Sequence, residues 1–218
     1  MKNKWAAKTI AGIFILIFPS IFSIAYGQDD GVPIKNIDAF RQNIKKASAE
    51  TISISSEFVQ KKHLGFLEED VESKGKFYFE KEDKLRWEYS SPFYFLIIFN
   101  GDSVLISNDE KTNTFNASSG RMFKEISNIM VSMVDGSILE SDRFACDYFE
   151  NHDAYILELI PQDVNMKAFL SKVRIFISKE DYTAEELLMI EHSGDYTHIK
   201  FINKRLNENI PDQIFELP

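Results

Sequence analysis

Cysteine is almost absent from this sequence, in which Cys146 is the only one among 218 residues. No intramolecular disulfide can form, so the fold must be stabilised by the packing of its side chains. Cys146 lies in a strand-like stretch, and we interpret it as a small buried apolar side chain rather than a redox group.

Glycine and histidine are also scarce. None of the nine glycines belongs to a Gly-rich phosphate-binding loop. The four histidines are His63, His152, His192 and His198. His192 and His198 flank one hairpin, but no cysteine or tight carboxylate group joins them to supply the roughly four ligands of a closed zinc site. The sequence therefore predicts neither a metal site nor a cofactor.

A hydrophobic run long enough to cross a membrane is missing as well. The apolar run of residues 10–18 falls short of the about 20 residues that a membrane anchor needs. It follows a start with three lysines and precedes Pro19, Ser20 and the small residues Ala25 and Gly27, a pattern typical of a signal peptide. We predict that Met1–Gly27 is a cleaved signal peptide, with an uncleaved anchor as the alternative.

Cleavage would leave one domain, residues 28–218, in the periplasm. No cysteine follows the cleavage site, so the mature protein is not predicted to be a lipoprotein. The three lysines of the signal leave with it and no acid does, which changes the net charge from −9 to −12. This charge disfavours binding of nucleic acid and of anionic membrane surfaces.

Aromatic residues, by contrast, are concentrated in Ser73–Gly101, which holds nine of them in 29 positions. Within it Leu85–Tyr89 alternates apolar and charged side chains, as a strand does. Tyr94–Phe99 is apolar at every position, so both of its faces should meet apolar partners. Asn100-Gly101 indicates a tight hairpin turn, and Gly75 a bend where the sheet curves.

The rest of the chain indicates two helices and further antiparallel strands. Asn36–Glu50, capped by Asn36, and Arg121–Val134 have helical apolar spacing. A short helical turn is expected at Asn165–Leu170. The other expected strands are Thr51–Lys62, Val104–Ser107, Lys111–Phe115, Arg143–Glu150, Ala154–Pro161, Val173–Ser178, Glu186–Glu191 and Tyr196–Asn203. We predict a mainly β fold with helices (α+β), in which a curved antiparallel sheet forms an incomplete β-barrel with a helical lid or plug.

The most plausible catalytic residues are Ser103, in Gly101-Asp102-Ser103, and His198, in Asp195-Tyr196-Thr197-His198. A serine hydrolase needs a serine, a histidine and an orienting acid, and GDSL-type hydrolases carry similar blocks. These blocks normally lie near the two ends of a chain with alternating β and α elements, which is missing here. The sequence therefore argues against an enzyme.

The aromatic face has two interpretations, an ordinary core or the wall of a cavity for an apolar ligand. Strand phase places Phe77 and Phe79 on one face, and Leu85, Trp87 and Tyr89 on one face with Arg86 and Glu88 opposite, toward water. Methionines of the second helix are adaptable side chains that could close over the cavity. The predicted ligand-binding residues are Phe77, Phe79, Leu85, Trp87, Tyr89, Met130 and Met133.

Several segments together resemble one family. They are Phe58-Val59-Gln60-Lys61, Gly75-Lys76-Phe77-Tyr78-Phe79, Lys84-Leu85-Arg86-Trp87-Glu88-Tyr89 with Pro92, and Asn100-Gly101-Asp102. Through these segments together, the chain resembles the family of the periplasmic outer-membrane lipoprotein carrier LolA, and the resemblance covers essentially the whole of residues 28–218.

The resemblance implies an incomplete barrel that shields the acyl chains of lipoproteins. Its implied partners are an inner-membrane ABC transporter that releases lipoproteins and an acceptor at the outer membrane, and we expect a monomer. The family has a basic residue before a proline in the loop after the first aromatic strand. Here the loop reads Lys81-Glu82-Asp83, so Lys81 is the candidate lid residue, without the fork of an arginine.

Two other function classes stay open. One is a lipid-binding or envelope-stress interaction module on the same fold, in which Tyr94–Phe99 would be a docking strand. The other is the hydrolase with Ser103 and His198.

The first prediction concerns the N-terminus. Because Ala25-x-Gly27 fits a signal-peptidase site, N-terminal sequencing of the exported protein should begin at Gln28. A membrane-bound product that retains residues 1–27 would contradict it.

Overall fold

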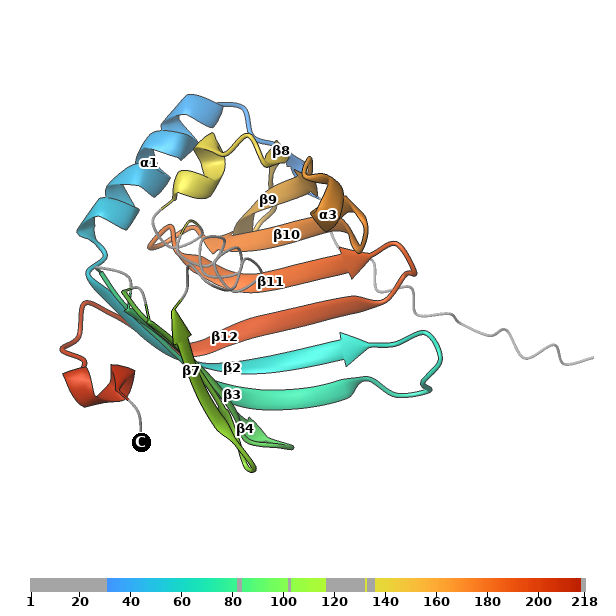
Figure 1. Cartoon of the computed structure of the whole chain (residues 1–218). Coiled ribbons are helices and arrows are strands. Elements are labelled where there is room, and N and C mark those ends of the chain that lie inside the picture. Colours follow the sequence, from blue (N-terminus) through green and yellow to red (C-terminus); the bar gives the residue numbers. More distant parts are fainter. Residues whose placement is uncertain (1–30, 82–83, 102, 117–131, 133–135, 217–218) are drawn as a thin grey trace, which may run out of the picture.

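The structure is a computed structural model (Figure 1) that describes residues 31–81, 84–101, 103–116, 132 and 136–216. Its helical elements are α1 (Ile37–Glu50), η2 (Ser137–Glu140), α3 (Val164–Lys167) and η3 (Asp212–Phe215). Its strands are β1 (Val32–Pro33), β2 (Ser53–His63), β3 (Val71–Glu80), β4 (Lys84–Ser91), β5 (Phe95–Asn100), β6 (Ser103–Asn108), β7 (Thr112–Asn116), β8 (Phe144–Glu150), β9 (Ala154–Pro161), β10 (Leu170–Ser178), β11 (Ala184–Glu191) and β12 (Tyr196–Leu206).

In the described ranges the twelve strands form one antiparallel sheet in the order β1-β8-β9-β10-β11-β12-β2-β3-β4-β5-β6-β7. Strands β1 and β7 are its two ends, so the sheet curves without closing (Figure 1). This confirms the predicted incomplete barrel. The pairing of β12 with β2 joins the two halves of the chain into a single sheet.

The first predicted helix is confirmed. Asn36 caps α1, because its side-chain Oδ1 accepts a hydrogen bond from the backbone N–H of Ala39 at 3.0 Å. Phe40 and Ile44 form the buried side of the helix, and Phe40 packs against Tyr148 and Tyr155 from the concave side of the sheet. The predicted helix Arg121–Val134, with Met130 and Met133, lies outside the described residues except for Ser132.

The core lies inside the curve of the sheet. Phe58, Phe77, Trp87 and Phe201 form a chain of ring contacts in which neighbouring centroids are 4.9 to 6.0 Å apart. Aromatic pairs at such separations add to the gain from burying their apolar area. The aromatic meander of the sequence is therefore one wall of the core, and β12 supplies a further part of it.

The outer face of β4 and β5 is covered as well. Leu96, Ile98 and Leu105 form a second buried cluster with Ile210 and Phe215 of the C-terminal segment. This confirms that both faces of β5 meet apolar partners. The same segment corrects one expectation. Arg86 does not face open water, because its side chain is only 13% exposed and its Nη1 donates a hydrogen bond to the carbonyl of Ile214 at 2.9 Å.

At Gly75 two strands approach each other closely. The pairing of β3 with β4 shifts by one residue between Lys74 and Gly75, as at a β-bulge. A Cβ atom on Gly75 would lie 1.9 Å from the carbonyl oxygen of Glu88 and 2.6 Å from the ring of Phe58. The bend predicted for Gly75 is thus a place where no side chain fits.

No helix of the described ranges is long and apolar enough to cross a membrane.

The second prediction concerns this close approach. Gly75→Ala should lower the free energy of unfolding by roughly 3 kcal/mol, because β4 and the Phe58 ring must both move. For a chain of this size that corresponds to a fall in melting temperature of about 6–12 °C, measurable by calorimetry.

Gly65→Ala is the matched control. A Cβ there would have Asp195 Oδ1 as its nearest neighbour, at 3.4 Å, so stability should change by less than about 0.5 kcal/mol. Equal melting temperatures for the two variants would show that the contact at Gly75 relaxes freely.

Candidate functional site: an apolar cavity in the half-barrel

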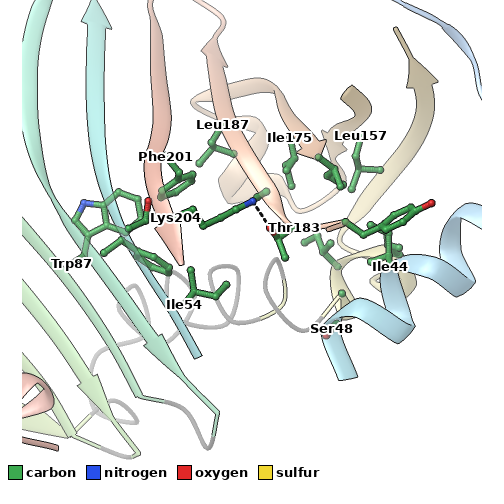
Figure 2. Close-up of a pocket in the computed structure, with 18 residues that line it drawn as sticks. Ile44, Ser48, Ile54, Trp87, Leu157, Ile175, Thr183, Leu187, Phe201 and Lys204 are labelled. Carbon is green, nitrogen blue, oxygen red and sulfur yellow. Dashed lines mark hydrogen bonds between the residues drawn. The ribbon is translucent and has the colours of Figure 1, made fainter. Parts of the chain in front are cut away.

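A cavity of about 90 Å³ opens between the concave face of the sheet, α1 and η2 (Figure 2). At about 15 Å³ for each water by this measure, it has room for roughly six water molecules. Ile44 and Ser48 approach it from α1, and Ile138 and Leu139 from η2. The strands contribute Ile54, Ser56, Phe77, Trp87, Leu157, Ile175, Ile177, Ala184, Leu187, Phe201 and Lys204.

Of the five strand residues predicted for the binding site, four are buried in one hydrophobic core, and Tyr89 is partly buried and packs against it. Phe77 and Trp87 line the cavity. Phe79 and Leu85 are 3% and 0% exposed, and they are not among the lining residues, nor is Tyr89. Their contact with a ligand stays a prediction, as does that of Met130 and Met133, which lie outside the described residues.

Lys81, the predicted lid residue, is attached to α1. Its Nζ donates a hydrogen bond to the carbonyl of Ala49 at 2.5 Å, and its backbone N–H donates to the carbonyl of Ile52 at 2.9 Å. The last carbonyls of a helix carry partial negative charge, so a cation is favourable there. Near the other end of α1, Arg41 Nη2 donates to Tyr148 Oη at 2.7 Å. These two contacts hold the helix on the sheet.

The cavity has one polar corner. Lys204 Nζ lies 3.1 Å from Asp181 Oδ2 and is hydrogen-bonded to Thr183 Oγ1, the contact drawn in Figure 2. The Lys204 side chain is 13% exposed. Burial raises the pKa of Asp181, but hydrogen bonds from Thr183 and the charge of Lys204 outweigh it, so the pKa lies below its ordinary value of 3.8. Asp181 is therefore ionised at neutral pH.

Several lining residues were missed by sequence reasoning. Phe201 had a usable signal, because it shares the period-two face of Ile199 in the predicted strand. Ile44 had one in the helical spacing of α1. Lys204 had none, since simple alternation along β12 would place it on the outer face.

The arrangement does not resemble a hydrolase site. Ser103 begins β6 and His198 lies on β12, five strands away in the sheet order. At about 4.8 Å per strand, they are roughly 24 Å apart along the sheet. His198 Nε2 lies 2.7 Å from Glu186 Oε2, on β11, which is not a neighbour of β6 in the sheet order.

The described residues contain no group of three or more His, Cys, Asp or Glu side chains that could hold a metal ion. His192 Nε2 lies 2.9 Å from the backbone carbonyl of Lys167, and His63 Nδ1 lies 2.9 Å from Asp70 Oδ1. Cys146 is half-buried and unbonded to another cysteine, and burial raises the pKa of its thiol, which disfavours the reactive thiolate.

The proposed docking strand Tyr94–Phe99 is wrong. The backbone of β5 pairs with β4 on one side and β6 on the other. A strand that is added to a sheet needs a free edge, and β5 has none.

The geometry defines a class of protein, an open antiparallel barrel around an apolar cavity with a helix over its concave side. A family model described as outer membrane lipoprotein carrier protein LolA matches residues 49–218. The chain belongs to this family, which supports a role in binding lipids or lipoproteins. The comparison with curated proteins gives no match.

Several solved structures are similar to this chain at low sequence identity. An uncharacterized conserved protein from Thermus thermophilus has a TM-score of 0.53 and 8% identity, over 84% of this chain and 95% of that one. A LolA superfamily protein from Nitrosomonas europaea has a TM-score of 0.44 and 10% identity, over 81% and 97% of the two chains. A putative outer membrane lipoprotein-sorting protein domain from Vibrio parahaemolyticus has a TM-score of 0.47 and 12% identity, over 81% and 94%.

The third prediction is that Ser103 and His198 are not catalytic. Ser103→Ala and His198→Ala should each leave function in vivo within about twofold of wild type, because the two side chains are too far apart to exchange a proton. Complementation of a deletion strain measures this. A loss of several hundredfold in either variant, at an unchanged melting temperature, would support the hydrolase instead.

Proposed function

We propose that this chain is a periplasmic carrier that holds acyl chains of lipoproteins in the cavity and shuttles them from the inner to the outer membrane. The observation that carries the proposal is the apolar cavity within an open barrel of the LolA family. In the proposal an inner-membrane ABC transporter supplies the lipoprotein, and an acceptor at the outer membrane, protein or lipid, receives it. No chemical step is required, in line with a carrier that is not an enzyme.

Phe77 and Trp87 contact the acyl chains in this proposal. Phe79, Leu85 and Tyr89 support that wall from the core, and Met130 and Met133 belong to the segment that closes over it. Lys81 would link closure to the position of α1, because it binds the C-terminal carbonyl of Ala49.

The size of the cavity suits reversible binding. Burying one methylene contributes about 0.8 kcal/mol. A space for roughly six water molecules holds about six methylenes, which would contribute about 5 kcal/mol, or roughly submillimolar affinity. A small, partly open cavity buries only a section of a lipid anchor. That keeps the affinity within the range from which cargo can be released.

The fourth prediction fills the cavity. Ala184 lines it from the start of β11, so a phenyl ring at this position should occupy the space of the acyl chain. Ala184→Phe should weaken the binding of a fluorescent acyl probe by at least about tenfold, as the loss of two buried methylenes or more would do. Mass spectrometry of the exported variant should find correspondingly less co-purified lipid than in wild type.

Ala145→Phe is the control, since Ala145 is exposed on β8. It should bind the probe like wild type. If a folded Ala184→Phe protein binds the probe as tightly as Ala145→Phe does, the cavity is not the acyl site and the carrier function fails.

A further inference from the structure

Lys204 is the only charged side chain among the described residues that line the cavity. The other lining residues are apolar, apart from the hydroxyl groups of Ser48, Ser56, Tyr182 and Thr183. An ammonium group placed beside apolar walls is costly unless it has acceptors. The position of Lys204 in the cavity therefore needs a structural explanation, and it suggests a function for the side chain.

The cause is a β-bulge in β12. Ile202 pairs with Glu57 and Arg205 pairs with Ser55, so Asn203 and Lys204 together face the single residue Ser56. Asn203 has a φ of 54°, in the left-handed region that asparagine tolerates better than most residues. The extra residue reverses the alternation of side chains along β12. Lys204 therefore points into the cavity, whereas regular alternation would place it on the outer face.

The partners of Lys204 leave part of its donor capacity for a ligand. An ammonium group has three N–H donors. In the described part of the chain, three oxygen atoms lie near Nζ: Thr183 Oγ1, Asp181 Oδ1 at 3.2 Å and Asp181 Oδ2 at 3.1 Å. The two Asp181 oxygens belong to one carboxylate and share a single N–H in this proposal, which leaves one N–H for a ligand. Figure 2 shows the Lys204 side chain reaching in among the apolar lining residues, with Leu187, Phe201 and Ile175 drawn around it.

We propose that Lys204 recognises the oxygen at the head of an acyl chain, donating a hydrogen bond from Nζ to a carbonyl or carboxylate oxygen while the hydrocarbon lies against the apolar lining. The inference rests on the proposed acyl-binding function and adds a specificity determinant to it. An ammonium N–H donates to the neutral oxygen of an ester as well as to the carboxylate of a free fatty acid, and Asp181 offsets the charge of Lys204 when the ligand is neutral.

The test uses three ligands of equal length: decanoic acid, methyl decanoate and decane. Their affinities are measured by displacement of a fluorescent acyl probe from the full mature protein. Lys204→Met keeps the length of the side chain but removes its donors. It should weaken decanoate binding by roughly tenfold or more, as expected for a lost hydrogen bond from a charged donor, and leave decane within about twofold.

The methyl ester identifies the source of the oxygen. If methyl decanoate weakens together with decanoate, Lys204 recognises acyl esters, which lipoprotein anchors and phospholipids carry. If only decanoate weakens, the ligand oxygen is a carboxylate. Lys200→Met is the matched control, because Lys200 is exposed on the same strand and binds Glu186 with its Nζ at 2.7 Å. It should leave all three affinities unchanged.

If Lys204 only stabilises the turn between β10 and β11, the Lys204→Met variant should give a different result. Lys204→Met would then melt at a lower temperature but lose affinity for the three ligands equally, and the proposal would be overturned. Should that variant not fold, Lys204→Gln keeps N–H donors for Asp181 and Thr183, and it should still lose affinity for decanoate relative to decane. If wild type binds none of the three ligands, the acyl-carrier function itself fails, a result distinct from equal losses.

Discussion

The concave face of an open, curved sheet must be covered by apolar groups, and this constraint organises the structure. Part of the cover comes from the sheet itself, through the ring contacts of Phe58, Phe77, Trp87 and Phe201. Another part comes from α1, which Arg41 and Lys81 attach to the sheet near its two ends. The part of the concave face that neither these rings nor α1 covers lines the cavity. An acyl chain is the kind of ligand that completes such a surface, because it contributes apolar area without needing polar partners.

The curvature of the sheet and the lining of the cavity depend on local departures from regular strand pairing. At Gly75 the absence of a side chain lets β3, β4 and the Phe58 ring approach closely. In β12 the bulge at Asn203 turns a charged side chain toward the cavity. One irregularity therefore shapes the apolar wall, while the other introduces its polar corner. Both are single-residue features whose effects depend on other segments: β2 and β4 at Gly75, and the connection between β10 and β11 at Lys204.

Much of the fold could be predicted from period and turn signals. The ends of α1 and of β9 match the predicted ranges, because a capping asparagine and turn residues mark them in the sequence. The candidate site was harder to predict. Trp87 and Leu85 share a face of β4, as alternation requires, but only Trp87 reaches the cavity. Alternation predicts on which face of the sheet a side chain lies. It does not predict how far that side chain is from a cavity that other strands enclose.

The sequence by itself determined the strand phase, the first helix and the aromatic wall, because each depends on residues close together in the chain. It also indicated the family, through short motifs that can be recognised without any tertiary contact. Tertiary structure alone decided three things: that Phe215 covers the outer face of β5, that Lys81 binds the end of α1, and that Lys204 meets Asp181. Each of these contacts joins segments at least 23 residues apart in the printed sequence. Hydrophobic periodicity reports which face of an element is buried, but only the folded sheet selects the partner on that face.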